Sequence, residues 1–344
     1  MRIAAIGYGG VGQAFVRLIY DKKSQLLAEG IDLKVIYVLG SKGGVYNLDG
    51  IDLKDLIDFS ASNKYISSYP FGGSGDLSFE DIIKNKDVDM VVEMTPTNIE
   101  TGQPGMYYIK TSLENGYNVV TANKGPILLA YHELQEIASR NNVQLGIGCT
   151  TGGALPTING GIMDLAGSNI YSIEGILNGT TNYILQMMEE EGMEYDEALK
   201  KAQELGIAET DPTLDVEGWD TATKLLILTN VLMKEKKTLN DIKVEGITFL
   251  TAADVKKALD EGYKYKLIGR AKKVNGKVEM SVKVEKVGIN NSLYNVDGKN
   301  KAVKYVSDTL GELTIIGGAS GVTSAAASIL RDIINIHRGY RFNR

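Results

Sequence analysis

The sequence predicts an α/β protein of two domains, the first built on a doubly wound parallel sheet. Three observations lead to this prediction. A glycine-rich turn follows a short apolar run at the N-terminus, apolar runs then alternate with amphipathic stretches up to residue 148, and the sequence changes character after Cys149. Alternation of strand and helix is typical of a parallel sheet covered by helices on both faces. A chain of 344 residues also exceeds the usual size of one hydrophobic core.

Composition limits what the protein binds. Hydrophobic residues make up 43% and charged residues 23%, as in ordinary globular proteins. The net charge of −6 argues against a nucleic-acid partner, because neutralising phosphates requires a basic face. The single cysteine excludes an internal disulfide and fits a reducing compartment, and no apolar stretch is long enough to span a membrane. We therefore expect a cytoplasmic protein with no nucleic-acid or membrane partner.

The first strand, expected at residues 2–6, is followed by a dinucleotide-binding pattern. GYGGVG comes directly after this strand, and an apolar helical stripe begins at residue 11. In such a pattern the first glycine allows the tight turn and the second lets the backbone approach a pyrophosphate. The third lets the helix pack closely on the strand. The expected cofactor contacts are therefore the residues of this turn: Gly7, Tyr8, Gly9, Gly10, Val11 and Gly12.

Further strands of the first domain are expected at residues 33–39, 88–94, 117–122 and 142–148. Ligands of such sheets bind beyond the carboxyl ends of the strands. The loop 93–105 is therefore expected to face the nicotinamide with Thr95 and Pro96. The segment TANKGP, which follows the next strand, is expected to project Lys124 over the same crevice.

The end of the second strand indicates which nicotinamide cofactor is preferred. A site for NAD usually has an Asp or Glu there, hydrogen-bonded to the ribose 2′-hydroxyl. This strand ends with Gly40, Ser41 and Lys42 and has no acid. A hydroxyl and an ammonium group suit a 2′-phosphate, so NADP(H) is expected to bind more tightly than NAD(H). The alternative is that Ser41 and Lys42 form only a polar turn.

The second domain starts in the glycine-rich segment after Cys149. A strand is expected at residues 171–177, helices at 178–192 and 194–206, and a hairpin at 266–287 around Asn275-Gly276. That pair supplies the positive φ angles of a type I′ turn. A glycine turn opens a helix of small residues at 317–334, which is expected to return to the first domain. The predicted domains are residues 1–148 joined by 318–344, and residues 149–317.

The stretch AETDPTLDVEGWDTATKL, residues 208–225, gathers five carboxylates near Lys224. If a helix begins near Glu217, Asp220 and Lys224 stand at i and i+4 on one face. Pro212 prevents a helix upstream, so Glu209 to Asp215 are expected to form an ordered loop over the start of this helix. An exposed ion pair would be the ordinary interpretation. However, the residues after Lys224 are apolar, so this helix is expected to be buried, where a lysine is costly unless it has a function.

Five segments together resemble the homoserine dehydrogenase family, over nearly the whole chain: GYGGVG, TANKGP, EGILNGTTNYIL, LGIAETDPTLDVEGWDTATKL and GGASGVTSAAASILRDI. The resemblance implies reversible reduction of L-aspartate 4-semialdehyde to L-homoserine by NAD(P)H, in threonine and methionine biosynthesis. It implies a Rossmann-type nucleotide domain, an α+β catalytic and dimerisation domain with a mixed sheet, and a homodimer. The chain ends at Arg344, so the form implied is the short one without a C-terminal regulatory domain.

The resemblance also implies roles for individual residues. Lys224 matches the proton donor of the family, and Lys124 matches a lysine that assists it. Acids matching Glu209 and Asp220 hold the substrate, with Asp215 nearby. Further expected contacts are Gly179 and Thr180 with the substrate, and Gly206, Gly318 and Gly321 with the cofactor.

The family often binds a monovalent cation through a glutamate side chain and backbone carbonyls. The position matching that glutamate is Gly148 here. A Na⁺ site in this chain would therefore depend on the carbonyl oxygens of Thr151, Gly153 and Leu155.

Two alternatives are open at this stage. A phosphorylating aldehyde dehydrogenase would use Cys149, in GIGCTTGG, as its nucleophile, and it would need a histidine base. The histidines here are His132 and His337, and neither lies where that family has its base. The second alternative is a catalytically silent NADP-binding sensor, which the presence of both Lys124 and Lys224 disfavours.

Overall fold

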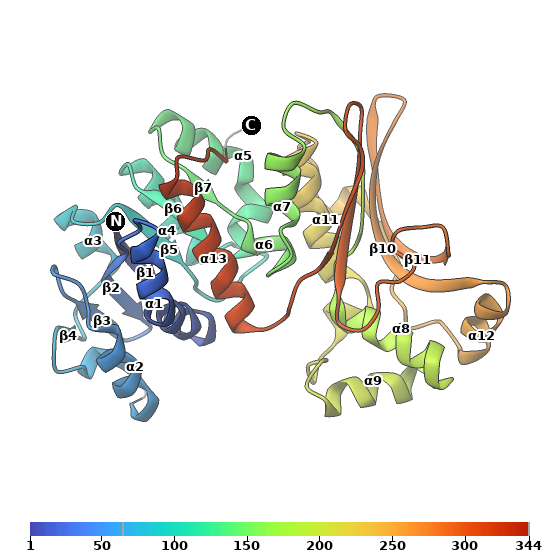
Figure 1. Cartoon of the computed structure of the whole chain (residues 1–344), viewed down its shortest axis with the longest axis horizontal. Helices are drawn as coiled ribbons and strands as arrows, with labels where there is room; N and C mark the ends of the chain where they lie inside the picture. Colours follow the sequence, from blue (N-terminus) through green and yellow to red (C-terminus); the bar gives the residue numbers. More distant parts are fainter. Residues whose placement is uncertain (64, 343–344) are drawn as a thin grey trace. The chain divides into compact units, whose positions relative to one another are not determined.

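The computed structural model describes residues 1–63 and 65–342. The chain divides into two compact units, Met1–Ala154 with Gly321–Arg344 and Leu155–Ser320 (Figure 1). We call these the first and the second unit. In the described residues, no helix combines the length and the apolar character needed to cross a membrane.

The first unit contains a seven-stranded sheet in the order β4-β3-β2-β1-β5-β6-β7. Its parallel strands are β1 (Arg2–Ile6), β2 (Lys34–Gly40), β5 (Met90–Glu93), β6 (Asn118–Thr121) and β7 (Leu145–Gly146). The predicted parallel sheet is therefore confirmed over these five strands. One edge differs, because β3 (Gly43–Tyr46) and β4 (Gly73–Ser74) add an antiparallel extension beside β2 that was not predicted.

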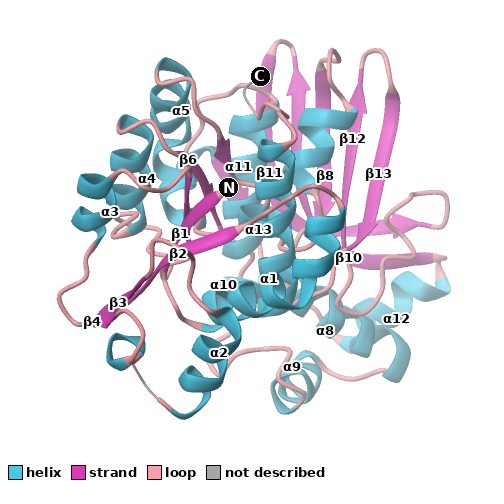
Figure 2. Cartoon of the chain, turned by 60° about the vertical axis from the view of Figure 1, so that its left-hand side comes forward, coloured by secondary structure: helices cyan, strands magenta, loops and turns pink. Residues whose placement is uncertain are grey.

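Helices cover both faces of this sheet, with α4 and α5 on one side and α1 and α13 on the other (Figure 2). The helices of the unit are α1 (Gly10–Ala28), α2 (Leu53–Ser62), α3 (Phe79–Asn85), α4 (Gly105–Glu114), α5 (Lys124–Arg140), α6 (Cys149–Gly152) and α13 (Val322–His337), with a short 3₁₀ turn at Ile66–Ser68. Phe15 of α1 and Ile329 of α13 are fully buried in the same core as Ile3 of β1. The C-terminal helix thus completes the core of the first unit.

The second unit contains a six-stranded mixed sheet in the order β13-β12-β8-β10-β11-β9. Its strands are β8 (Ile170–Ile176), β9 (Ile242–Val244), β10 (Tyr263–Val274), β11 (Lys277–Gly288), β12 (Lys301–Ser307) and β13 (Gly311–Gly317). The predicted hairpin is confirmed as β10–β11, whose turn residues Asn275 and Gly276 have φ of 50° and 82°. Strands β9, β12 and β13 were not predicted from the sequence.

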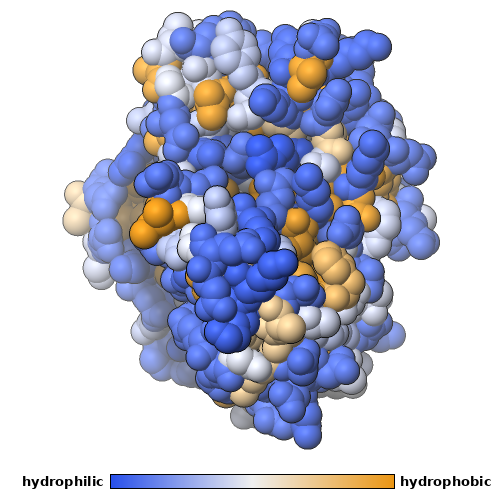
Figure 3. Space-filling view, turned by 90° about the vertical axis from the view of Figure 1, so that its right-hand side faces the viewer, coloured by the Kyte–Doolittle hydropathy of each residue, from blue (hydrophilic) through white to orange (hydrophobic). Residues whose placement is uncertain are grey.

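The helices of the second unit are α8 (Gly179–Glu191), α9 (Tyr195–Glu204), α10 (Thr213–Val216), α11 (Trp219–Leu232) and α12 (Ala252–Asp260), with short helical turns at Thr157–Asn159, Gly160–Asp164 and Leu239–Asp241. Helix α11 begins at Trp219 rather than near Glu217, because its N-cap Gly218 has a left-handed φ of 88°. The predicted loop before it also contains the short helix α10. The face shown in Figure 3 is mostly hydrophilic, with apolar side chains in separate small groups.

Candidate active site

A pocket of about 740 Å³ lies at the carboxyl ends of β1 and β2 in the first unit. It is lined by nine of the predicted cofactor contacts, namely Gly7, Tyr8, Gly9, Gly10, Val11, Ser41, Lys42, Thr95 and Pro96. Four aromatic residues that sequence reasoning missed also line it: Tyr65, Phe79, Tyr107 and Tyr108. Three separate loops thus converge on one cavity, as expected where strand order reverses in such a sheet.

The glycines of the turn after β1 fit the predicted pyrophosphate-binding pattern. A Cβ on Gly12 would lie 2.0 Å from the Gly7 carbonyl oxygen, so only glycine allows this approach of helix to turn. A Cβ on Gly9 would meet nothing within 4 Å, so the backbone is open to a ligand there. Helix α1 begins at the next residue and has no acidic residue in its first turn. Its N-terminus therefore favours an anion such as a pyrophosphate.

The turn between β2 and β3 places Ser41 and Lys42 in the same pocket, with both residues exposed. The last residues of β2, Leu39 and Gly40, contribute no carboxylate. An acid does enter the pocket from α3, where the Glu80 carboxylate accepts a hydrogen bond of 3.1 Å from the Tyr107 hydroxyl. Positive and negative groups both line the cavity, so its charge does not by itself select one cofactor.

Lys224 and two acids form a connected cluster in the second unit. The Lys224 ammonium donates to Asp220 Oδ2 at 2.5 Å and to the Leu177 carbonyl at 2.9 Å. The side chains of Lys224 and Asp220 are 17% and 12% exposed, so this pair is largely shielded from water. Asn178, the N-cap of α8, donates to Asp220 Oδ2 at 2.9 Å and to Asp215 Oδ1 at 2.6 Å. The structure therefore brings Asp215, Asp220 and Lys224 together around one asparagine that sequence reasoning missed.

Asp215 is a partly buried acid that a neighbouring cation would stabilise. Burial raises the pKa of the Asp215 carboxyl, and the nearby charge of Asp220 adds to this effect, while the hydrogen bond from Asn178 opposes it. A positively charged group bound beside Asp215 would stabilise its ionised form. The cluster can therefore combine a cation-binding carboxylate with a proton-donating ammonium.

The other predicted substrate-binding residues and glycines lie in loops and at helix ends. Glu209 is exposed, and its carbonyl accepts a hydrogen bond from Gln203. Thr180 donates to the Ile207 carbonyl at 3.1 Å, and a Cβ on Gly179 would lie 2.8 Å from the Lys299 carbonyl oxygen. The remaining glycines occupy turns: Gly206 follows α9, and Gly318 and Gly321 lie between β13 and α13.

The lysine and the cysteine of the first unit have different surroundings. Lys124 is the first residue of α5 and is half-buried, behind the N-cap residue Asn123. Cys149 is buried at the start of α6, and its thiol lies 3.6 Å from the Ala325 carbonyl oxygen. It belongs to the hydrophobic core around β1. The thiol thus has the surroundings of a packed core residue.

The three carbonyls predicted for a Na⁺ site belong to Thr151 in α6, to Gly153 directly after it, and to Leu155. The Leu155 carbonyl already accepts a hydrogen bond of 2.8 Å from the Thr157 amide. None of these three residues offers a carboxylate, and the amide of Gly148 donates to Asp332 at 2.7 Å.

Comparison with known proteins gives one consistent family. The family model described as homoserine dehydrogenase matches residues 156–334. A homoserine dehydrogenase from Methanocaldococcus jannaschii is 42% identical, with 98% of each chain covered. An NAD(+)-dependent homoserine dehydrogenase from Pseudomonas canavaninivorans is 38% identical, covering 98% of this chain and 96% of the relative.

Solved structures agree with these relatives. A homoserine dehydrogenase structure from Archaeoglobus fulgidus superposes with a TM-score of 0.87 at 32% identity, covering 98% of this chain and 99% of that one. A hyperthermophilic archaeal homoserine dehydrogenase mutant in complex with NADPH has a TM-score of 0.84 at 27% identity, covering 100% and 99%. Neither a phosphorylating aldehyde dehydrogenase nor a silent sensor finds support in these matches.

Proposed function

The chain belongs to the homoserine dehydrogenase family, and from that premise we propose which of its residues carry the reaction. It is an NAD(P)-dependent oxidoreductase that interconverts L-aspartate 4-semialdehyde and L-homoserine. The nicotinamide, when bound, supplies or accepts a hydride at its C4 atom. The protein then has three tasks: holding the amino acid, stabilising the charge on the reacting oxygen, and moving one proton.

Lys224 is the proposed proton donor to the substrate oxygen. An ammonium group has three protons, and Lys224 directs two of them to Asp220 and to the Leu177 carbonyl. The third can reach an alkoxide, which the positive charge also stabilises. After the transfer the neutral amine still has two protons for the same two acceptors. The two acceptors that hold the Lys224 ammonium are the single observation that best supports the assignment, and they suit the reverse reaction equally.

Asp215 and Glu209 are the proposed partners of the substrate α-ammonium group. Asp220 is proposed to hold Lys224 in place and to contact the substrate at the edge of its site. Charge-assisted hydrogen bonds between carboxylate and ammonium are stronger than neutral ones. The raised pKa of Asp215 supports this role, because a bound cation would offset the cost of its burial. Gly179 and Thr180, at the first turn of α8, complete the proposed substrate contacts.

NADP(H) is proposed as the preferred cofactor, with Lys42 and Ser41 on its 2′-phosphate and the turn after β1 on its pyrophosphate. Thr95, Pro96, Gly206, Gly318 and Gly321 are proposed to contact it, and Lys124 to assist Lys224.

We further propose that the enzyme works as a homodimer. Light scattering from the purified enzyme tests this, since the proposal requires twice the mass of one chain.

A Na⁺ ion on the carbonyls of Thr151, Gly153 and Leu155 stays a proposal. The dependence of activity on Na⁺ at constant ionic strength tests it.

Replacing Lys224 by methionine tests the central assignment. The oxidation of L-homoserine is followed at 340 nm, and the dissociation constant of NADP(H) is measured by calorimetry. We expect kcat to fall by roughly 10²–10⁴-fold, the usual contribution of a general acid, with little change in cofactor affinity. Lys236→Met is the control, since Lys236 is exposed after α11. If Lys224→Met folds and keeps kcat within about threefold of the parent, Lys224 is not the proton donor.

A further inference from the structure

Glu93 is a fully buried carboxylate at the carboxyl end of β5, with no exposed surface. Its Oε1 atom accepts hydrogen bonds from the Thr95 amide at 2.8 Å and from the Thr95 hydroxyl. Its Oε2 atom accepts from the Thr121 hydroxyl at 2.7 Å. A carboxylate without water needs such donors, because an unsatisfied buried charge is strongly unfavourable. Glu93 therefore ties the loop after β5 to the end of β6.

A second layer of hydrogen bonds extends from this carboxylate to the start of α5. The backbone amide of Asn123 donates to the Thr121 hydroxyl at 2.9 Å, and the Thr121 hydroxyl donates in turn to Glu93. The Asn123 side chain caps α5 by accepting from the Gly125 amide at 3.1 Å. The same side chain reaches back to the carbonyls of Thr95 and Pro96, at 3.4 Å each. Lys124 directly follows this capping asparagine.

Helix α4 closes the space around the Glu93 carboxylate and the Asn123 side-chain amide. A Cβ on Gly105, the first residue of that helix, would lie 2.6 Å from Asn123 Nδ2 and 3.2 Å from the Glu93 carboxyl carbon. The carboxylate and the amide thus have little room to move. Thr95 and Pro96 line the cofactor pocket, so this small buried network lies directly beneath its wall.

We propose that Glu93 is a positioning residue for the dehydrogenase reaction, which holds the Thr95–Pro96 segment of the cofactor pocket and the capped start of α5 in register. The inference rests on the proposed roles of that pocket and of Lys124. Glu93 is not proposed as a catalytic residue, because its carboxylate is fully buried and is not part of the lining of the cofactor pocket.

The carboxylate is needed in its ionised form for the observed pattern. In Glu93→Gln the amide nitrogen would replace one accepting oxygen. If it replaced Oε2, it would donate to the Thr121 hydroxyl oxygen, which already accepts from Asn123. The Thr121 hydroxyl proton would then lose its acceptor. Burial raises the pKa of Glu93, which is the cost of keeping a charge at this position.

The test compares Glu93→Gln and Thr121→Val with the parent enzyme. Each variant disturbs one link of the network and keeps the side-chain volume nearly constant. We expect kcat for homoserine oxidation to fall by about tenfold or more in both, since a small misplacement of reacting groups costs up to about 10²-fold. The dissociation constant of NADP(H) should change by less than about threefold, because the pyrophosphate and phosphate contacts lie on other loops.

Ser112→Ala is the matched control. Ser112 is fully buried on α4, and its hydroxyl has no hydrogen-bond partner among the residues that the structure describes, so its loss should leave kcat unchanged. A merely structural role for Glu93 would lower the melting temperature of the variants but leave kcat per folded enzyme within about twofold, and that result would overturn the proposal.

Lys124→Ala separates this proposal from the function on which it rests. If Lys124→Ala keeps the parent kcat, the assisting role of Lys124 is wrong. If Lys124→Ala lowers kcat and the Glu93 and Thr121 variants do not, the positioning role of Glu93 is wrong. A fall in all three variants supports both proposals.

Discussion

At the scale of single residues, Asn178 stabilises two neighbouring carboxylates in the second unit. Asp215 lies close enough to Asp220 for the charge of Asp220 to raise the pKa of Asp215. One amide nitrogen donates a hydrogen bond to each carboxylate, and Lys224 adds a positive charge at Asp220. Asn178 itself is fixed because its side-chain oxygen Oδ1 caps α8 by accepting a hydrogen bond of 2.9 Å from the Thr181 backbone amide. A single polar side chain thereby orients both acids.

Asp215→Asn should weaken substrate binding and increase stability at neutral pH. Loss of a charge-assisted hydrogen bond, worth about 1.5–3 kcal/mol, should raise the KM for homoserine by about tenfold or more. The folded-state pKa of Asp215 is raised, so the parent loses stability as pH rises from the ordinary carboxyl range through that higher pKa. The variant lacks this loss. Urea unfolding should therefore show a gain in stability at pH 7 that shrinks towards acid pH.

An unchanged KM in Asp215→Asn would remove Asp215 from the substrate site. Asp211→Asn is the control, because Asp211 is an exposed acid of the same segment whose carboxylate accepts from Thr213. It should leave KM unchanged.

The i and i+4 relation of Asp220 and Lys224 was visible in the sequence, because helical periodicity fixes which neighbours share a face. The contacts of Asn178 and Glu93 were not visible. Asn178 and Asp215 lie 37 positions apart, and Glu93 and Thr121 lie 28 apart. Such pairs meet only through tertiary packing, which no local pattern encodes. Polar residues at strand ends and helix caps were a signal that could have singled both out.

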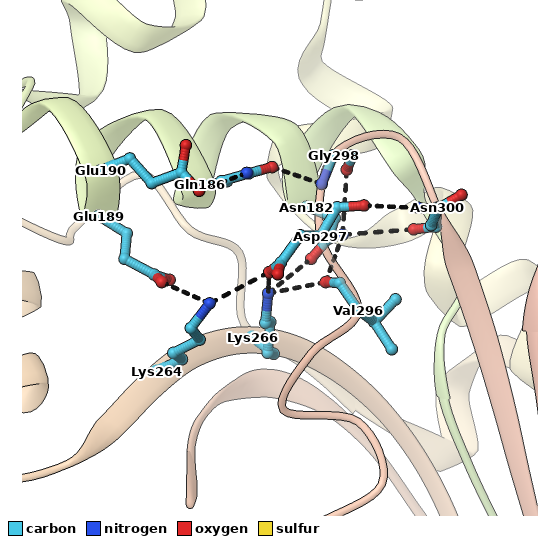
Figure 4. A network of polar contacts seen from close by, with 10 residues as sticks. All are labelled: Asn182, Gln186, Glu189, Glu190, Lys264, Lys266, Val296, Asp297, Gly298 and Asn300. Atoms are coloured by element: carbon cyan, nitrogen blue, oxygen red, sulfur yellow. Dashed lines mark hydrogen bonds and ion pairs between the residues drawn. The ribbon is translucent and has the colours of Figure 1, made fainter. Parts of the chain in front are cut away.

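At the scale of elements, α8 is fastened to the loop between β11 and β12 by a buried polar network (Figure 4). Lys266 of β10 has no exposed surface, and its ammonium donates to the Val296 carbonyl at 2.8 Å and to Asp297 at 3.1 Å. Asn182 of α8 donates to the carbonyls of Val296 and Gly298, at 2.9 and 3.0 Å. This loop and α8 therefore pack as one body, and α8 carries Asn178 at its start.

Lys266→Met should destabilise the second unit. The variant removes one donor from the Val296 carbonyl, which keeps Asn182, and one from Asp297, which is 35% exposed and keeps Lys264 at 3.3 Å. Loss of a hydrogen bond to a charged group costs about 1.5–3 kcal/mol. Equilibrium unfolding in urea measures the change. Lys256→Met is the control, since Lys256 forms an exposed i and i+4 pair with Asp260 on α12 and should lose little stability. Equal losses of unfolding free energy in the two variants would show that the network around Lys266 contributes no more stability than an exposed ion pair.

The elements that were predicted share a strong local pattern, and those that were missed lack one. Strands β1, β2 and β5 are apolar runs buried on both faces, as parallel strands are. Strand β12 was missed because Lys301 and Lys304 interrupt its apolar pattern. The Lys304 charge is satisfied by Glu174 of β8 at 3.0 Å, so a partner on another strand makes this sequence suitable for a sheet. Strands β3 and β4 are short and glycine-rich.

At the scale of the whole molecule, the fold class followed from the order of elements, whereas the cofactor preference depends on a few side chains at one turn. One relative is named as NAD(+)-dependent, and another homoserine dehydrogenase was solved in complex with NADPH. Strand β2 ends without an acid, and Lys42 and Ser41 line the pocket. Global stability offers a way to compare the two cofactors, because a ligand stabilises the fold it binds by an amount set by its affinity.

The melting temperature should rise more with NADP than with an equal concentration of NAD. At concentrations far above both dissociation constants, a tenfold difference in affinity adds about 1.4 kcal/mol of stability. Lys42→Ala should bring the NADP shift close to the NAD shift, because the 2′-phosphate loses its ammonium partner. Added salt should reduce the advantage of NADP in the parent, since the proposed charge pair lies near solvent. Lys22→Ala, an exposed residue further along α1, should behave as the parent. Equal shifts for both cofactors in the parent, or an undiminished NADP shift in Lys42→Ala, would show that the turn after β2 does not choose the cofactor.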